Sequence, residues 1–156
     1  MTSDNMFTEK IYSRWMKENQ LAKYKHLKEI LPEIKGNVLD IGVGPGWFEE
    51  FLGIKAIGID VDRESAARVI ASGDFLPFRD KTFDFVVCLD TIHLLNGKDV
   101  SRVMRGNGIL LVSHFVNKGN EEKVKKTLLN MFPEFKLSEG RIVGNKEKDL
   151  VLVLKK

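Results

Sequence analysis

The sequence predicts an α/β fold, namely a Rossmann-like, doubly wound, mostly parallel sheet of seven strands whose last strand is antiparallel. Short apolar segments alternate with segments of helical periodicity over residues 38–115. Residues 83–89 form a near-continuous apolar run, which is typical of a central parallel strand buried on both faces. Two apolar segments flank Gly144-Asn145-Lys146 near the end of the chain, which predicts a final hairpin.

The individual elements follow in order along the chain. A helical segment is predicted over residues 5–31, with a slip in its period near Asn19 and an end at Pro32. The predicted helices cover 47–52, 90–104 (with a break near Asn96-Gly97) and 121–131, and a turn is expected at Gly106-Asn107-Gly108. The seven strands are expected at 38–41, 56–59, 69–71, 83–89, 109–115, 135–143 and 149–154.

The crossover between strands two and three is unusually short. Only 13 residues separate Asp60 from Asp74, and residues 63–68 provide barely one or two helical turns. A strand of five residues spans about 17 Å, so such a crossover covers little of the sheet face. We therefore expect residues 5–31 or a second subunit to cover this thin part of the sheet.

Composition limits the class of protein. A length of 156 residues suits a single domain, divided here into a helical segment (1–35), a core (36–115) and a C-terminal helix and hairpin (116–156). Cys88 is the only cysteine, which excludes a disulfide framework and favours a reducing cytoplasm. The net charge of +3 is only mildly basic. No window is apolar enough for a membrane span, and no Cys/His cluster suggests a metal.

A glycine-rich turn directly follows the first predicted strand. Asp40 ends that strand, and Gly42, Gly44 and Gly46 follow at alternate positions. Glycines permit positive φ and let a ligand approach the backbone. In a doubly wound sheet, ligands bind at the carboxyl ends of the strands beside strand one. The carboxylate of Asp40 there favours a ligand with positive charge and would repel a pyrophosphate. A nicotinamide-dependent oxidoreductase is therefore the less favoured reading.

Two further acidic residues follow neighbouring strands at the same edge. Asp60 ends strand two, 20 residues after Asp40, and is placed to accept hydrogen bonds from ribose hydroxyls. Asp74 follows strand three and is placed to accept from an adenine amino group while Phe75 packs near the ring. As structural alternatives, Asp60 caps a helix and Asp74 is a turn residue.

Four motifs together resemble one known family. They are Asp40-Ile41-Gly42-Val43-Gly44-Pro45-Gly46, Gly58-Ile59-Asp60, Gly73-Asp74-Phe75-Leu76-Pro77-Phe78 with Asp80-Lys81-Thr82-Phe83-Asp84, and Arg105-Gly106-Asn107-Gly108-Ile109-Leu110. Their order over about residues 36–115 is similar to that of class I S-adenosylmethionine-dependent methyltransferases of the type 11 kind. The resemblance implies methyl transfer from S-adenosylmethionine, with S-adenosylhomocysteine as product.

The resemblance also implies roles for individual residues in donor binding. Asp40 would face the methionine ammonium, directly or through water, and the Leu89 carbonyl would accept from the same group. Asp60 would hold the ribose hydroxyls. Asp74 and the Phe75 amide would read the adenine. The expected cofactor-binding set is Asp40, Gly42, Gly44, Gly46, Asp60, Val61, Asp74, Phe75 and Leu89.

The acceptor side is less well defined by the sequence. Asp90 and His93 follow strand four and are candidate catalytic bases, although Asp90 alternatively caps a helix and His93 alternatively packs on it. His114 is a weaker candidate. Tyr12, Trp15 and Tyr24 are candidate walls of the acceptor site, and Trp15 alternatively belongs to a helix core.

The acceptor itself remains open at this stage. No Asn/Asp-Pro-Pro-Tyr motif follows Val87, which disfavours the amino groups of adenine and glutamine. A small-molecule acceptor is favoured, with RNA or protein as alternatives. A homodimer is a further expectation. The alternative function is a non-catalytic S-adenosylmethionine-binding subunit of a partner complex.

Overall fold

The computed structural model describes residues 3–156, with side chains from Lys10 onward apart from that of Tyr12. The helices are α1 (Ser3–Leu27), α2 (Trp47–Leu52), the 3-10 turn η1 (Ile92–Leu94), α3 (Lys98–Val103) and α4 (Glu121–Met131). The strands are β1 (Val38–Ile41), β2 (Ile57–Asp60), β3 (Val69–Ile70), β4 (Phe83–Cys88), β5 (Met104–Val116), β6 (Lys136–Val143) and β7 (Lys148–Lys155).

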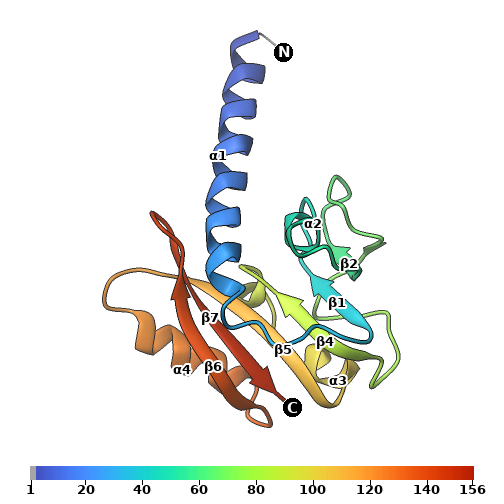
Figure 1. Ribbon diagram of the computed structural model, residues 1–156. Coiled ribbons are helices and arrows are strands. Elements are labelled where there is room, and N and C mark those ends of the chain that lie inside the picture. The colour runs from blue at the N-terminus through green and yellow to red at the C-terminus, as the bar shows by residue number, and fades with distance from the viewer. Residues whose placement is uncertain (1–2) are drawn as a thin grey trace.

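The seven strands form one sheet in the order β3-β2-β1-β4-β5-β7-β6 (Figure 1). Strands β3, β2, β1, β4 and β5 pair in parallel, whereas β7 is antiparallel to both β5 and β6. The expected fold class is confirmed. β4 is the middle strand of the sheet, as its apolar run predicted.

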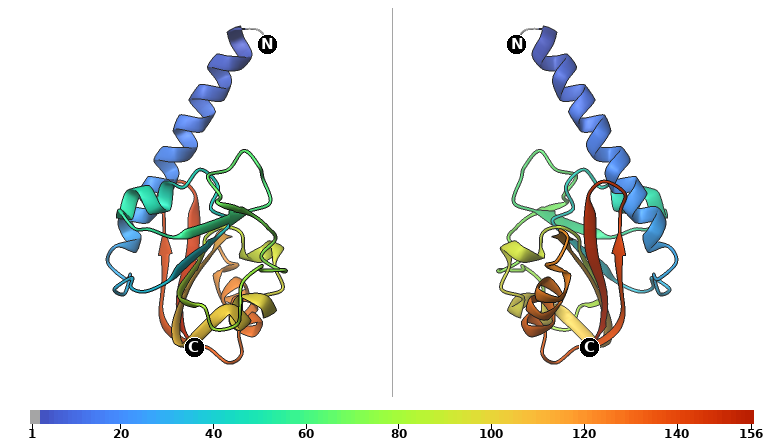
Figure 2. Two further views of the ribbon diagram at one scale, coloured as in Figure 1. Left: turned by 90° about the vertical axis from the view of Figure 1, so that its right-hand side faces the viewer. Right: turned by 90° about the vertical axis from the view of Figure 1, so that its left-hand side faces the viewer.

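Helices cover both faces of the sheet (Figure 2). Alternate residues of β1 point to opposite faces, as strand geometry requires. Leu39 and Ile41 join the apolar cluster beneath α3 and α4, and Val38 joins the cluster beneath α1 and α2. β1 is therefore buried on both sides. The glycine turn after it emerges at the carboxyl edge of the sheet.

Three predicted boundaries are corrected. α1 is one continuous 25-residue helix without a break at Asn19, and it ends at Leu27 rather than at Pro32. The helix expected over 90–104 is shorter and consists of η1 and α3, with the predicted break before α3, where Gly97 is the N-cap with φ 80°. The expected turn at Gly106-Asn107-Gly108 lies within β5 as a bulge, because β4 residues 83 and 85 pair with β5 residues 104 and 109.

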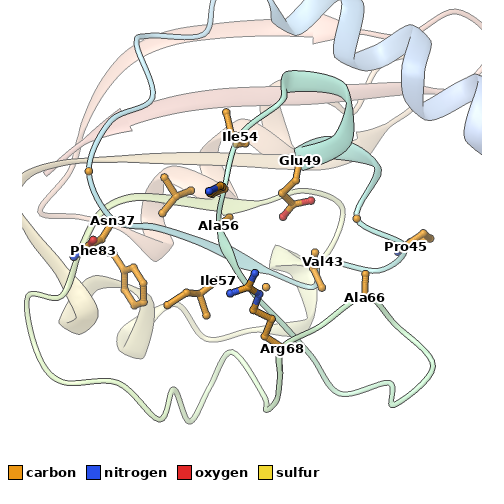
Figure 3. A pocket seen from close by; sticks show the side chains of 15 residues that line it. Asn37, Val43, Pro45, Glu49, Ile54, Ala56, Ile57, Ala66, Arg68 and Phe83 are labelled. Carbon is orange, nitrogen blue, oxygen red and sulfur yellow. The ribbon is translucent and has the colours of Figure 1, made fainter.

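The sheet face beside β2 is thinly covered, as the short crossover predicted. Residues 61–68 form turns and bends rather than a helix. A groove of about 560 Å³ remains, bordered by Val43, Glu49, Ala56, Ala66 and Arg68 among others (Figure 3). None of its described lining residues belongs to α1, which packs against α2 and β6 instead. The expectation that residues 5–31 fill this space is therefore wrong.

Candidate functional site

The turn after β1 adopts a conformation that favours glycine at three positions. Gly42, Gly44 and Gly46 have φ values of 76°, 51° and 78°. A Cβ on Gly42 would overlap the side chain of Thr91, whereas a Cβ on Gly44 would meet open space. Gly42 thus serves a close approach of two segments as well as the backbone turn. Gly44 is required by conformation, because the left-handed region strains other residues.

Asp60 holds this turn against the end of β2. The Gly44 amide donates to Asp60 Oδ2 at 2.9 Å, and the Asp62 amide donates to Asp60 Oδ1 at 3.0 Å. Each carboxylate oxygen accepts more than one hydrogen bond, so Asp60 retains capacity for a ligand. The alternative of a helix N-cap is wrong, because no helix follows within residues 61–68.

A cavity of about 140 Å³ opens at the carboxyl edge between α1, α2 and the glycine turn. Its lining residues are Met16, Gln20, Tyr24, Asp40, Gly42, Val43, Gly44, Pro45, Trp47, Phe48, Leu89 and Asp90. Six residues predicted for the donor or acceptor site therefore meet at one place. They are Tyr24, Asp40, Gly42, Gly44, Leu89 and Asp90. The hydroxyl of Thr91 donates to the Leu89 carbonyl at 3.2 Å.

The predicted adenine-binding residues lie outside this cavity lining. Phe75 is 82% exposed, and Val61, another residue of the predicted cofactor-binding set, is exposed as well. Asp74 Oδ1 accepts from the Asn96 amide at 2.8 Å, and the Phe75 amide donates to the Ser72 carbonyl at 3.1 Å. These contacts fit the alternative in which Asp74 is a turn residue. The Phe75 ring faces solvent.

Asp40 is almost completely buried, with 4% of its surface exposed. Its carboxyl lies against that of Glu49, in the first turn of α2. Burial, followed by this neighbour, raises the pKa of Asp40 well above its ordinary value. The sequence analysis missed Glu49, because acidic residues are common in the first turn of any helix.

Asp90 is held by groups from two other elements, α1 and β5. It has a left-handed φ of 57°. Its amide donates to Ser113 Oγ at 2.9 Å, and Gln20 Nε2 donates to Asp90 Oδ2 at 3.4 Å. Lys23 Nζ lies 3.7 Å from the same oxygen and 2.8 Å from Asp149 Oδ2. The result is a largely buried polar cluster beside the cavity.

The surroundings of Asp149 in this cluster disfavour its ionised form. Burial, followed by the charge of Asp90, raises the pKa of Asp149 to about 7, although Lys23 acts in the opposite direction. The sequence analysis missed Lys23, Ser113 and Asp149. Its only available signal was an aspartate at the start of an otherwise apolar strand.

The two histidines at this edge lie together. His93 is in η1 and His114 is near the end of β5, and their rings pack edge to face with centroids 5.2 Å apart. The predicted alternative of His93 on a long helix is corrected to a short 3-10 turn. Neither histidine lines the 140 Å³ cavity.

The three predicted acceptor walls have different surroundings. Tyr24 is buried and packs against Phe48 and Phe51, with ring centroids 5.3 and 5.8 Å apart. It therefore belongs to the α1–α2 contact and to the cavity wall at once. Trp15 is 40% exposed on α1 and does not line the cavity. The side chain of Tyr12 lies outside the described residues.

The described part of the chain has neither a metal-binding cluster nor a membrane-spanning helix. No group of three or more His, Cys, Asp or Glu side chains there is arranged to hold a metal ion. None of the described helices is long and apolar enough to cross a membrane.

Cys88 is buried, and burial raises the pKa of its thiol well above the ordinary value. This thiol is therefore a poor nucleophile.

Comparisons with known sequences agree with this architecture. Residues 39–112 match the family model described as a methyltransferase domain. Two uncharacterised proteins of Methanocaldococcus jannaschii are 31% and 32% identical over 74% and 68% of this chain. The chain spans 65% and 54% of the lengths of these two relatives.

Solved structures share the fold across nearly the whole chain. An S-adenosylmethionine-dependent methyltransferase of Thermotoga maritima has a TM-score of 0.70 and 22% identity, over 94% of this chain and 96% of its own. A chain from the Haloferax volcanii Trm112 methyltransferase activator complex has a TM-score of 0.74 and 14% identity, over 99% and 96%. The match over residues 39–112, the strand order and the glycine turn thus agree: this part of the chain is similar to a methyltransferase domain, and the chain has the fold of class I S-adenosylmethionine-dependent methyltransferases.

Proposed function

We propose that this protein transfers the methyl group of S-adenosylmethionine to an acceptor by in-line displacement. The observation that carries the proposal is the charge of the cavity at the carboxyl edge. Among its described lining residues, Asp40 and Asp90 carry the only carboxyl groups, and none is a Lys, Arg or His. The donor carries a sulfonium and an ammonium and no phosphate. An anionic cavity beside a glycine turn therefore suits this donor better than a dinucleotide.

The residues around the turn support a specific orientation of the donor. The methionine ammonium would face Asp40 and the Leu89 carbonyl, and the ribose hydroxyls would meet the free lone pairs of Asp60. Adenine would lie outside the cavity lining, near Asp74 and the exposed Phe75 ring. In this orientation the donor would approach the turn at Gly44, where a Cβ would meet open space. Val61, which is exposed beside Asp60, would border the ribose.

Methyl transfer needs the acceptor atom directly behind the methyl group. Such positioning supplies up to roughly 7–11 kcal/mol of the acceleration in favourable cases. A base is needed only when the acceptor must lose a proton. Asp90 borders the cavity, and His93 with His114 lies at the same edge, so these groups are the proposed bases. The proposed acceptor is a small molecule.

Two experiments test the proposal in sequence. Calorimetry should show binding of S-adenosylmethionine and S-adenosylhomocysteine and none of NAD. Methyl-labelled donor should then be incubated with cell extract, which is afterwards separated into small molecules, RNA and protein. Label in the small-molecule fraction is the expected result. Donor binding without transfer to any fraction would instead support the non-catalytic subunit.

We further propose that a second copy of the chain covers the groove beside β2. The groove lies where the crossover from β2 to β3 has no helix, and α1 leaves it open. Sedimentation equilibrium of the protein tests this directly. A dimer is expected, and a monomer at concentrations well above those of the cell would reject the second copy.

A further inference from the structure

Two carboxyl groups, those of Asp40 and Glu49, lie in contact at the boundary of the donor cavity. Asp40 lies in β1 and lines the cavity. Glu49 belongs to α2, lies within hydrogen-bonding reach of Asp40 and also lines the groove beside β2 (Figure 3). Both carboxylate oxygens of Glu49 are buried, and neither has a hydrogen-bond partner among the described residues. An ionised carboxylate only accepts hydrogen bonds, so two of them in contact need a proton or a cation.

Among the described residues, no basic side chain forms an ion pair with Asp40 or Glu49, although Lys55 and Arg68 line the same groove as Glu49. The titratable groups that raise the pKa of Asp40 are Glu49 from α2 and Asp60 from β2. Asp40 in turn raises the pKa of Tyr24 from α1 and of Cys88 from β4. All four neighbours are acids.

The nearby lysines are engaged with other carboxylates. Lys17 pairs with Glu50 at 3.4 Å, and Lys23 pairs with Asp149 at 2.8 Å. Among the described residues, none of the ion pairs includes Asp40 or Glu49. Two adjacent buried carboxylates would repel each other, which disfavours the state in which both are ionised. Burial of Asp40 acts in the same direction.

We propose that Asp40 and Glu49 share one proton in the unliganded protein and that donor binding displaces this proton to solvent. The donor's ammonium then hydrogen-bonds Asp40 and supplies the positive charge that the proton supplied before. No covalent bond of the donor changes in this step, and the buffer accepts the released proton. Glu49 is thus a positioning residue of the donor site. The inference rests on the proposed function, because it takes S-adenosylmethionine as the ligand.

The proton count is measured by calorimetry with S-adenosylhomocysteine, which has the same ammonium and no labile methyl group. Titrations at one pH in buffers of different ionisation enthalpy give the protons released per ligand bound. The wild type should release close to one proton per ligand bound at neutral pH. As pH rises through the acidic range, its Kd should therefore fall by up to about tenfold per pH unit.

Matched variants separate this role from a structural one. In Glu49→Gln the amide donates to Asp40 and the neighbouring carboxylate is gone, so binding should persist with clearly less proton release and a shallower pH dependence than in the wild type, while burial of Asp40 remains. Glu50→Gln, on the exposed neighbouring residue, should release as many protons as the wild type. A melting curve shows that each variant is folded.

The outcomes distinguish the two proposals. Wild-type binding without proton release, or unchanged release in Glu49→Gln, would overturn the shared proton and leave the methyltransferase assignment intact. A folded wild type that does not bind S-adenosylhomocysteine would overturn the proposed function, and this inference with it.

Discussion

Lys23 and Asp149 form a buried ion pair, with Nζ 2.8 Å from Oδ2 and only 5% and 3% of the two side chains exposed. Lys23 belongs to α1 and Asp149 to β7, so the pair fastens the N-terminal helix to the sheet. Asp90 lies 3.7 Å from the same ammonium and borders the donor cavity. The attachment of α1 and the position of a proposed catalytic group therefore depend on one lysine.

Loss of the ammonium should destabilise the fold markedly. Lys23→Met leaves Asp149 and Asp90 without their shared cation, and removing one partner of a buried pair costs about 3–5 kcal/mol of unfolding free energy. Urea unfolding measures this loss. The double variant Lys23→Met with Asp149→Leu should recover most of it, because the buried Asp149 carboxylate is removed with its cation. The remaining Asp90 carboxylate is 32% exposed and still accepts from Gln20 and Ser113. The exposed pair Arg14–Glu18 is the control, and Arg14→Ala should change stability by less than about 1 kcal/mol.

Asp149 should also make stability depend on pH. Its pKa is about 7 in the folded protein, whereas an unfolded aspartate titrates near about 4. Between these values the folded state binds more protons, so the unfolding free energy contributed by Asp149 falls as pH rises from about 4 to about 7. Melting temperatures at pH 5 and pH 8 measure the effect. Asp149→Asn should flatten this difference, and an unchanged difference would show that other groups cause it.

The local periodicities of the sequence were sufficient to predict most of the sheet. Val38–Ile41, Phe83–Cys88 and Trp47–Leu52 lie where apolar runs and flanking glycines placed them. The continuity of α1 was not predictable in the same way. Its apolar period slips near Asn19, and tertiary contacts made by Lys23 and Tyr24 hold the helix across that slip.

The candidate site was only partly predictable for a similar reason. Asp40, Gly42 and Leu89 meet at one cavity because each lies at the carboxyl end of a strand, which topology alone implies. Glu49 and Asp149 come from segments whose sequences look like an ordinary helix start and an ordinary edge strand. Their proximity to Asp40 and Asp90 arises from the packing of α2 and from the β5–β7 register, neither of which the local sequence determines.

Asp60 should contribute strongly to donor affinity. Asp60→Ala removes the proposed acceptor of two ribose hydroxyls and the partner of the Gly44 amide. A weakening of roughly 1.5–3 kcal/mol is expected for the loss of a charged hydrogen bond, measured as the Kd of S-adenosylhomocysteine. Asp62→Ala is the nearby control, since Asp62 is exposed and its carboxylate accepts from the neighbouring Glu64 amide rather than from the glycine turn. Unchanged affinity in Asp60→Ala would remove this residue from the site.

The histidine pair should affect catalysis rather than donor binding. If His93 removes a proton from the acceptor, His93→Ala should lower kcat/KM for methyl transfer by about 10²–10⁴-fold. The Kd of the donor should stay the same, because neither ring lines the cavity. His114→Ala tests whether the packed ring 5.2 Å away supports His93, and a smaller loss is expected. Wild-type rates in both variants would leave Asp90 as the proposed base.

A charged side chain placed in the groove beside β2 should prevent the second copy of the chain from binding there. Ala56 lines the groove and carries only a methyl group. Ala56→Arg should shift the sedimentation of the protein from dimer to monomer without a large change in melting temperature. Ile70→Arg, on the exposed face of β3, provides the matched control and should stay dimeric. Identical sedimentation of Ala56→Arg and the wild type would place the interface elsewhere.

A crystal structure with S-adenosylhomocysteine tests the account most directly. We expect the ribose hydroxyls on Asp60, the adenine beside Asp74 and Phe75, and the amino acid end in the cavity with its ammonium toward Asp40. An empty cavity at saturating ligand would contradict the proposed function, as would a ligand seated instead in the groove against Arg68.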